Sequence, residues 1–331
     1  MSETGATRID ELAEGIVGGD RTVLARAITL VESKRADDVR VAQDLLARLL
    51  DRTGHAIRVG VTGPPGVGKS TLIEALGMRL VEKGHRVGVL AVDPSSTVSG
   101  GSILGDKSRM TRLAGDDRAF IRPSPSGGSL GGVARRTRET MLLCEAAGYD
   151  VMLVETVGVG QSETRVADMV DFFLAMMLPG AGDELQGIKK GIVEIADLIA
   201  VNKADGDNEP RARDAVREYS SALRYLRPAS SSWRSQAVMM SALTGHGIDE
   251  LWELVLEHRA AVTESGELET RRAAQRERWM WGMIDEELRG RLREHPAVRE
   301  RLSGTLEDLH GGRITATAAA LGLLEAFATT A

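Results

Sequence analysis

The chain has 331 residues, of which 42% are apolar, 27% are charged and only 3% are aromatic. This composition is typical of a globular protein and excludes a disordered chain, a collagen and a coiled-coil rod. The net charge of −6 argues against nonspecific binding to nucleic acid, because a polyanion attracts basic surfaces. The single cysteine, Cys144, excludes a disulfide or a thiolate metal cluster within one chain.

The N-terminus and the most apolar stretch both argue against export or membrane insertion. Residues 1–14 are polar and acidic and lack the apolar segment of a secretory signal. Residues 170–178 are the most apolar stretch, but they are fewer than the roughly 20 residues that span a bilayer. We therefore expect a cytoplasmic protein with no membrane and no nucleic-acid partner. An organelle matrix, reached after loss of a transit peptide, is the alternative.

The spacing of apolar residues predicts helices that alternate with strands. Residues 8–50 have helical spacing, as in Leu45, Leu46 and Leu49, whereas residues 57–62 form a short apolar run typical of a buried strand. Further strands are expected at 87–92, 151–154, 172–177, 198–201 and 237–240, and helices at 69–83, 133–148, 208–227 and 247–263. This alternation predicts an α/β fold with a mostly parallel central sheet flanked by helices.

Glycine is enriched in one part of the chain, since fifteen of the 37 glycines lie between Gly60 and Gly132. Within this part, residues 63–70 read Gly-Pro-Pro-Gly-Val-Gly-Lys-Ser and fit the phosphate-loop pattern G-x-x-x-x-G-K-[ST]. They lie between an expected strand and an expected helix, as the pattern requires. An ordinary turn before a helix is the alternative. The predicted nucleotide-binding residues of this loop are Gly63, Pro64, Pro65, Gly66, Val67, Gly68, Lys69, Ser70 and Thr71.

The residues that end this loop have side chains suited to a triphosphate. Glycine allows backbone N–H groups to turn toward phosphate oxygens, and the N-terminus of the following helix adds positive charge. Lys69 is expected to contact the β- and γ-phosphates, Ser70 to hold Mg²⁺, and Thr71 to donate to the α-phosphate. We therefore predict a nucleoside triphosphate site.

A second motif indicates which base is bound. Asn202-Lys-Ala-Asp205 directly follows the expected strand 198–201, as the guanine-reading N-K-x-D motif does. A carboxylate at Asp205 can accept from both N1–H and N2–H₂ of guanine, and adenine offers no such pair of donors. Asn202 would support the base, and the stem of Lys203 would lie over the ring. With the backbone support expected from residues 241–243, the predicted guanine-binding residues are Asn202, Lys203, Asp205, Ser241, Ala242 and Leu243. These residues favour GTP over ATP.

Two strand ends have carboxylates in positions that suit metal binding and phosphate sensing. Glu155-Thr-Val-Gly158 follows strand 151–154, where many GTPases have D-x-x-G. Glu155 would act on Mg²⁺ through water, and the N–H of Gly158 would face the γ-phosphate. Asp93 ends strand 87–92 and can reach the same ion. The following loop contains Asp106 and is expected to order around the γ-phosphate. A structural strand-end carboxylate and a solvated loop are the alternatives.

Hydrolysis would proceed by in-line attack of water on the γ-phosphate, with Lys69 and Mg²⁺ absorbing the developing charge. No glutamine directly follows Gly158, and Gln161 comes three residues later. A water-orienting glutamine is therefore not expected at the usual position. We predict a GTPase that is slow alone and is activated by a partner.

These motifs divide the chain into three predicted regions. They are an N-terminal helical extension over 1–50, a P-loop G domain over 51–263 and a C-terminal helical dimerisation arm over 264–331. In the arm, Trp281, Ile284, Leu288 and Leu292 are spaced along one helix face. This stripe would pack either on its own domain or against a second copy of the chain.

Taken together, the motifs closely resemble those of the MeaB family. The resemblance rests on the double proline of the phosphate loop and on residues 93–96, 129–132, 155–162 and 202–205. At motif level it covers about residues 40–262. The family includes the methylmalonic aciduria type A protein, and its members were formerly labelled arginine or lysine transport kinases.

The resemblance implies a P-loop GTPase of the class that includes the signal-recognition and nickel-insertion GTPases. Members look like homodimers that bind GTP or GDP with Mg²⁺. They act as chaperones that gate adenosylcobalamin delivery to methylmalonyl-CoA mutase and protect that enzyme. No tightly bound cobalamin is expected on this chain. By this resemblance the catalytic residues are Lys69, Asp93, Asp106 and Glu155, the metal ligands are Ser70, Asp93, Asp106 and Glu155, and the switch residues are Gln161 and Lys189.

Other functions remain open from the residues alone. A metallochaperone-type GTPase shares the core but would need a cluster of cysteine and histidine ligands. A membrane-targeting GTPase would have a receptor-binding or Met-rich module. An ATP-dependent transport kinase is disfavoured by Asn202 and Asp205, because these residues favour guanine over adenine. The client could also be a related acyl-CoA mutase, for which the chain would serve as a GTP-dependent scaffold.

Overall fold

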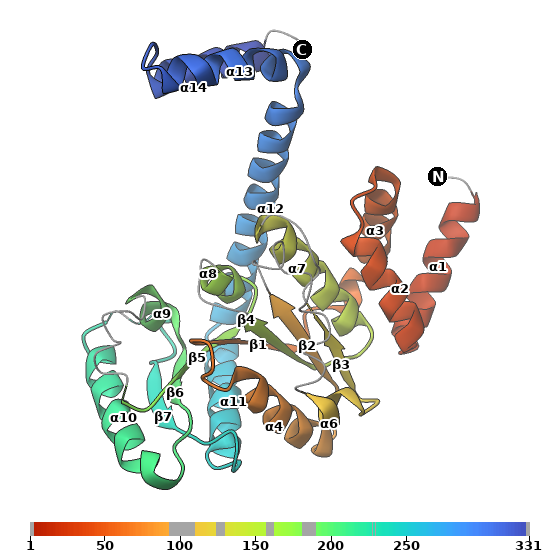
Figure 1. Cartoon of the computed structure of the whole chain (residues 1–331). Helices are drawn as coiled ribbons and strands as arrows, with labels where there is room; N and C mark the ends of the chain where they lie inside the picture. Colours follow the sequence, from red (N-terminus) through yellow and green to blue (C-terminus); the bar gives the residue numbers. More distant parts are fainter. Residues whose placement is uncertain are drawn as a thin grey trace. The chain divides into compact units, whose positions relative to one another are not determined.

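The computed structural model describes residues 3–92, 110–123, 130–156, 162–180, 190–226, 228 and 230–328. The chain forms two compact units, Met1–Gln275 and Arg276–Ala331. The first unit contains a central sheet with helices on both faces, and the second is helical (Figure 1). The α/β fold with a parallel sheet and helical terminal regions, as expected from the sequence, is confirmed.

The first unit is built on a parallel sheet of seven strands within the described ranges. Their spatial order is β3 (Ala119–Arg122), β2 (Val87–Val92), β4 (Val151–Thr156), β1 (Ile57–Thr62), β5 (Phe172–Met177), β6 (Leu198–Val201) and β7 (Gln236–Met239). Every residue of β2, β4, β5 and β6 is buried, as expected of parallel strands with helices on both sides. Such strands are near-continuous apolar runs, and this is why the spacing of apolar residues predicted them.

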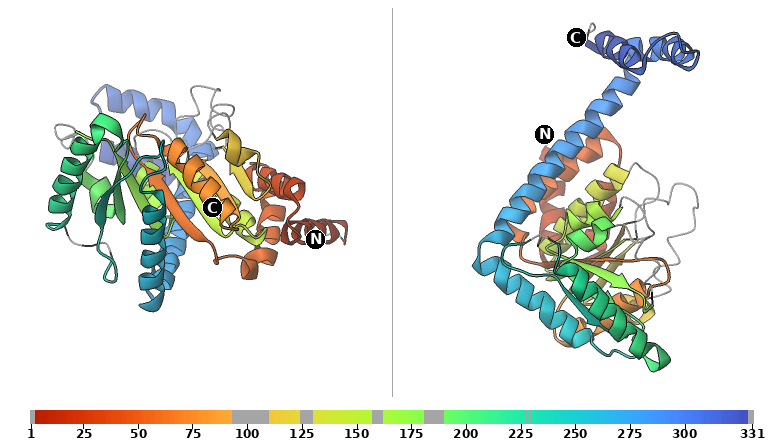
Figure 2. Two further views of the ribbon diagram at one scale, coloured as in Figure 1. Left: turned by 90° about the horizontal axis from the view of Figure 1, so that it is seen from below. Right: turned by 90° about the vertical axis from the view of Figure 1, so that its left-hand side faces the viewer.

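The two faces of the sheet bury separate sets of side chains, because successive side chains of a strand point to opposite sides. The helices of one face are α4 (Lys69–Glu82), α6 (Thr111–Ala114) and α11 (Ile248–Glu264). Those of the other face are α7 (Leu130–Ala146), α8 (Ser162–Ala167), α9 (Lys190–Ile195) and α10 (Glu209–Leu223). Figure 2 shows helices on both sides of the sheet. The first face buries Val61 and Leu153, and the second buries Val154 and Phe173.

The N-terminal helices belong to the first unit. They are α1 (Glu3–Val17), α2 (Arg21–Glu32) and α3 (Ala36–Leu49), followed by a short 3₁₀ turn over Leu50–Arg52. They pack on one another and on α7. The carboxylate of Asp20 caps α2 by accepting from the backbone N–H groups of Thr22 at 2.8 Å and Val23 at 3.1 Å. Leu24 and Ile28 then face the core.

The carboxyl ends of the strands meet at one edge of the sheet. β1 lies between β4 and β5, and Val61 is in register with Glu155. The hydroxyl of Thr156 donates to that of Thr62 at 2.9 Å inside the protein, which joins the ends of β4 and β1. The loops after β1, β4, β6 and β7 therefore leave from this edge, where open α/β sheets bind their ligands.

At the opposite edge, buried ion pairs hold the start of β5. The carboxylate of Asp171 accepts from Arg272 at 2.7 and 2.8 Å and from Arg259 at 3.0 Å. Burial alone would raise the pKa of Asp171, but the Arg272 hydrogen bond and the charges of Arg272, Arg58 and Arg259 hold it below its usual value. Arg272 lies near the start of α12 (Glu267–Glu294), so this network attaches the first turns of that helix to the sheet.

The second unit consists of the later part of α12 with α13 (Pro296–His310) and α14 (Ala316–Ala328). α13 and α14 pack against each other, and the ring of His295 lies 5.1 Å from that of Phe327. One face of α12 in this unit presents apolar side chains to solvent. They are Met280, Trp281, Ile284 and Leu288.

Most strand bounds agree with those indicated by the apolar runs. The strands expected at 57–62, 87–92, 172–177 and 198–201 have these bounds in the structure. β4 continues to Thr156, and β7 begins and ends one residue earlier than expected. Neither β3 nor the short helices α6, α8 and α9 were predicted. The expected start of the C-terminal arm, residue 264, is the last residue of α11, whereas the first unit extends to Gln275. None of the described helices combines the length and the apolar character needed to cross a membrane.

Candidate nucleotide-binding site

The loop between β1 and α4 has a backbone that its glycines make possible. Gly63, Gly66 and Gly68 have φ angles of +148°, +76° and +103°, in the region that favours glycine. A Cβ at Gly63 would lie 2.5 Å from the carbonyl oxygen of Met176, and a Cβ at Gly68 would lie 2.5 Å from Nδ2 of Asn202. The loop therefore packs closely against the end of β5 and against Asn202 as it turns into α4.

Lys69 is the first residue of α4, and its side chain folds back over the loop. Its Nζ donates to the carbonyl oxygens of Gly63 at 2.8 Å and Pro64 at 3.3 Å, and the residue is buried. Burial lowers the pKa of Lys69, although the charges of Glu155 and Glu163 partly oppose this effect. A polyphosphate in the loop would give this ammonium group charged acceptors, which bind it more strongly than two carbonyls do.

Ser70 and Glu155 bring two oxygen ligands together at the start of α4. Ser70 Oγ donates to Oε1 of Glu155 at 3.0 Å, and Glu155 is buried near the end of β4. Mg²⁺ prefers such hard oxygen ligands and is usually held by one or two protein groups together with phosphates and water. Across the described residues, no group of three His, Cys, Asp or Glu side chains forms a metal site by itself. The pair therefore fits a Mg²⁺ site that a bound nucleotide completes.

Asn202 connects the phosphate loop to the loop after β7. Its Nδ2 donates to the carbonyl oxygen of Val67 at 2.7 Å, and its Oδ1 accepts from the N–H of Ala242 at 2.9 Å. Asn202 is buried, and each hydrogen bond uses a different end of its amide. An aspartate lacks the donor and an aliphatic residue lacks both groups. This one side chain therefore bonds to both loops at once.

Ser241 orients the carboxylate of Asp205. The hydroxyl of Ser241 donates to Oδ2 of Asp205 and accepts from the N–H of Thr244 at 3.2 Å. The loop after β6 and the loop after β7 are joined further by the N–H of Ala204, which donates to the carbonyl of Met240 at 3.0 Å. Within the part of the chain that the structure describes, no group donates to Oδ1 of Asp205. This oxygen is therefore free to accept from the N–H donors of a base.

Lys203 has an unusual backbone conformation beside these groups. Its φ is +62°, and no other non-glycine residue in the described ranges has a positive φ. Such conformations cost free energy and are concentrated at functional sites. The side chain of Lys203 is exposed, which leaves its stem free to cover the face of a base.

The structure brings the described members of the predicted site to one edge of the sheet. Residues 63–71 follow β1, Glu155 lies in β4, residues 202–205 follow β6, and residues 241–243 follow β7. The other predicted residues lie outside the described ranges. They are Asp93, Asp106, Gly158, Gln161 and Lys189.

Three features of this edge were not predicted from the sequence. The hydroxyl of Thr156 bonds to that of Thr62 across two strands, and the motif that contains Thr156 gives no sign of this contact. Glu163 is buried in the first turn of α8, close enough for its charge to act on Lys69. Arg79 bonds to the loop after β7, but no local pattern indicates this contact because its partner lies 166 positions away.

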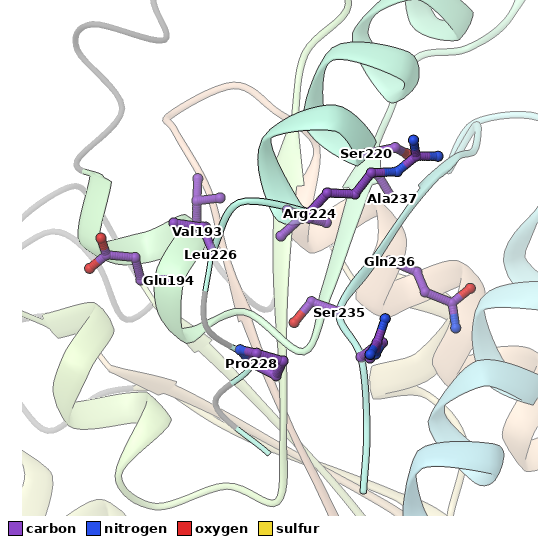
Figure 3. Close-up of a pocket in the computed structure, with 11 residues that line it drawn as sticks. Val193, Glu194, Ser220, Arg224, Leu226, Pro228, Ser235, Gln236 and Ala237 are labelled. Atoms are coloured by element: carbon purple, nitrogen blue, oxygen red, sulfur yellow. The ribbon is translucent and has the colours of Figure 1, made fainter. Parts of the chain in front are cut away.

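A cavity of about 400 Å³ lies elsewhere, between α9, the end of α10 and β7 (Figure 3). Its lining includes Val193, Arg224 and Gln236, and it includes none of the phosphate-loop or guanine-motif residues. The carboxylate of Glu194 points away from the other labelled side chains in Figure 3. This cavity is therefore separate from the candidate nucleotide site.

Known proteins resemble the chain along most of its length. The family model described as methylmalonyl Co-A mutase-associated GTPase MeaB matches residues 24–297. A putative GTPase of Caulobacter vibrioides is 56% identical over 322 residues, which cover 97% of this chain and 98% of that protein. A mitochondrial methylmalonic aciduria type A homolog of Mus musculus is 48% identical and aligns with 99% of this chain and 81% of its own. The crystal structure of a LAO/AO transport system kinase is 39% identical, with a TM-score of 0.79 and 98% of each chain covered.

Proposed function

This chain is a GTPase of the MeaB family, and we propose that it binds GTP with Mg²⁺ at the carboxyl edge of its sheet and uses hydrolysis to assist a mutase. The family is associated with methylmalonyl-CoA mutase. The observation that carries the proposed site is the double hydrogen bond of Asn202, which joins Val67 in the phosphate loop to Ala242 in the loop after β7. One nucleotide can span these two loops, with its phosphates at one and its base at the other.

Asp205 is the group that would select guanine. Its carboxylate, oriented by Ser241, can accept from N1–H and N2–H₂ of guanine, whereas adenine presents an acceptor at N1. Asp205→Ala should weaken GTP binding by at least about tenfold and leave ATP binding unchanged. The exposed neighbour Asp207 supplies the control variant Asp207→Ala. A wild-type protein that binds ATP as tightly as GTP contradicts the proposal.

Hydrolysis would depend on the groups around the start of α4. Ser70 and Glu155 would hold Mg²⁺, with Asp93 and Asp106 as further proposed ligands, and the ion when bound neutralises charge on phosphate oxygens. Lys69 would bind the γ-phosphate and stabilise the charge that develops there. Water attacks the γ-phosphorus in line as the bond to the β,γ-bridging oxygen breaks, which gives GDP and phosphate.

We infer that the partner is adenosylcobalamin-dependent methylmalonyl-CoA mutase. Family membership and the name of the Mus musculus relative support this inference. In this account the nucleotide state gates delivery of adenosylcobalamin to the mutase and protects that enzyme. Gln161 and Lys189 would act as switch residues, and the N–H of Gly158 would face the γ-phosphate. The cytoplasmic location expected from the sequence stays a prediction.

We further propose that the chain is a homodimer whose C-terminal helices meet in the interface. The exposed apolar side chains of α12, such as Trp281 and Leu288, support this proposal. Trp281→Glu with Leu288→Glu should convert a dimer into a monomer in analytical ultracentrifugation. A wild-type protein that sediments as a monomer at all concentrations contradicts it.

A further inference from the structure

Arg79, in the last turn of α4, contacts the loop between β7 and α11. Its Nη2 donates to the carbonyl oxygen of Gly245 at 2.8 Å, and its Nη1 donates to the carboxylate of Asp249. Gly245 lies in the middle of this loop, residues 241–247, and Asp249 lies in the first turn of α11. One guanidinium group therefore holds both the loop and the helix that follows it.

The loop over residues 241–247 needs such a restraint because of its glycines. Gly245 and Gly247 have φ angles of +82° and +76°, and glycine has more backbone freedom to lose than any other residue. A Cβ at position 245 would collide with Nη2 of Arg79. Glycine thus permits the close approach of Arg79, and Arg79 in turn fixes the conformation of the glycine.

A short chain of hydrogen bonds leads from Gly245 to the guanine-reading carboxylate. The N–H of Gly245 donates to the carbonyl oxygen of Ser241 at 2.9 Å. The hydroxyl of Ser241 donates to Asp205 and accepts from the N–H of Thr244 at 3.2 Å. Gly245 and its neighbour Thr244 are therefore both bonded to the residue whose hydroxyl orients Asp205.

We propose that Arg79 is a positioning residue for guanine selectivity, an inference that rests on the proposed GTP site. The helix that contains Arg79 begins at Lys69, directly after the phosphate loop. Because α4 is a continuous helix of 14 residues, its first turn and Arg79 stand in a fixed relation. Arg79 thereby holds the base-orienting loop against the same element that holds the phosphates.

A merely stabilising ion pair is the competing explanation, and a neighbouring residue separates the two. The side chains of Arg79 and Asp249 are 31% and 49% exposed, and pairs this exposed contribute little to stability. Lys83, the residue that directly follows α4, also pairs with Asp249, at 3.1 Å. Among the described residues, the side-chain bond to the carbonyl of Gly245 comes from Arg79 and not from Lys83. Lys83→Ala is therefore the matched control, because it weakens the same pairing and leaves the bond to Gly245 in place.

The test compares GDP with IDP in the full-length wild type, Arg79→Ala and Lys83→Ala. IDP lacks the exocyclic amino group that would donate to Asp205, so the ratio of the two dissociation constants reports on that contact. In Arg79→Ala the preference for GDP should fall by about fivefold, roughly the effect of one misaligned hydrogen bond. In the same variant the KM for GTP should rise, while kcat at saturating GTP stays at the wild-type value. The control Lys83→Ala should keep the wild-type preference for GDP over IDP.

An unchanged preference for GDP in folded Arg79→Ala overturns the inference. An equal loss of that preference in Lys83→Ala also overturns it, and so does a fall in the kcat of Arg79→Ala with its KM unchanged. If Arg79→Ala does not fold, Arg79→Lys is measured in the same way. A single ammonium group at this position can keep the pairing with Asp249 but lacks the second arm that reaches Gly245, so the GDP preference should again fall. A wild-type protein with no preference for GDP would instead contradict the proposed guanine site.

Discussion

The amide nitrogen of Asn202 lies 2.7 Å from the carbonyl oxygen of Val67, so the residue that follows β6 is bonded to the loop that follows β1. β5 separates these two strands in the sheet. The contact is close because Gly68 has no side chain, and a Cβ there would lie 2.5 Å from the same nitrogen. Hydrogen bonds within the protein therefore hold the phosphate-binding and base-reading parts of the site at a fixed distance.

Asn202→Ala should weaken binding of both the base and the phosphates. It removes the bonds to Val67 and Ala242, and it leaves two buried backbone groups without their partner. Loss of two buried hydrogen bonds should reduce GDP affinity by roughly 100-fold, measured by titration with a fluorescent GDP analogue. Asn208→Ala, at an exposed position before α10, is the control. Wild-type affinity in Asn202→Ala would contradict the assignment.

Glu155→Ala should separate hydrolysis from binding. The variant removes the carboxylate that lies 3.0 Å from Ser70 Oγ but leaves the phosphate loop and the guanine residues intact. GTP affinity should stay within about threefold of wild type, whereas the single-turnover hydrolysis rate should fall by about 100-fold or more. Glu82→Ala, at the exposed end of α4, is the matched control. Retained hydrolysis in Glu155→Ala would favour a scaffold in which this carboxylate has no catalytic part.

Asp171→Asn should strongly destabilise the first unit. The aspartate is buried and accepts from Arg272 and Arg259, so its neutralisation leaves buried positive charge uncompensated. The expected loss is about 3–5 kcal/mol in the free energy of unfolding, measured with urea. Asp214→Asn removes an exposed pair with Arg217 and should cost about 1 kcal/mol or less. Equal small losses in the two variants would show that the network does not act as a buried ion pair.

The same network predicts how stability depends on pH. The pKa of Asp171 is held below its usual value in the folded protein, so its contribution is present above the unfolded pKa and is lost as pH falls through the folded pKa. The stability difference between wild type and Asp171→Asn should therefore be constant from pH 5 to 8 and shrink below about pH 4. A difference that grows on acidification would have the wrong sign for this account.

Gly60→Ala should displace the helix that follows the Glu155 motif. A Cβ at Gly60 in β1 would lie 2.9 Å from Val166 in α8 and 2.9 Å from Phe173 in β5. Overpacking of this kind should destabilise the fold by about 1–3 kcal/mol, measured by thermal unfolding. Gly191→Ala in α9 meets no atom within 4 Å and should be neutral or stabilising by up to about 1 kcal/mol. Similar melting temperatures in the two variants would show that α8 does not need the space at Gly60.

Much of the fold and of the site could be predicted because both depend on local patterns. Buried parallel strands are uninterrupted apolar runs, as at 172–177, and their bounds follow from the residues themselves. The motifs at 63–70 and 202–205 each follow such a strand. Because parallel strands end at one edge, strand-end motifs that are distant in sequence were expected to meet.

The parts that were not predicted depend on short elements and on distant contacts. β3 has only four residues, and α8 and α9 have six residues each, too few to establish a period. The bond between Arg79 and Gly245 joins positions 166 apart, and the pair of Arg272 with Asp171 joins positions 101 apart. A single arginine among 42 basic residues gives no sign of which carbonyl or carboxylate it will meet.

The most direct test of the proposed function is the rate of GTP hydrolysis at saturating GTP and Mg²⁺, with and without methylmalonyl-CoA mutase. We predict slow hydrolysis by the isolated chain and an increase of about tenfold or more when the mutase is added. In Glu155→Ala both the slow hydrolysis of the isolated chain and its increase on addition of the mutase should be lost. The same rate of hydrolysis with and without the mutase would contradict the proposal that the chain acts as its GTP-dependent chaperone.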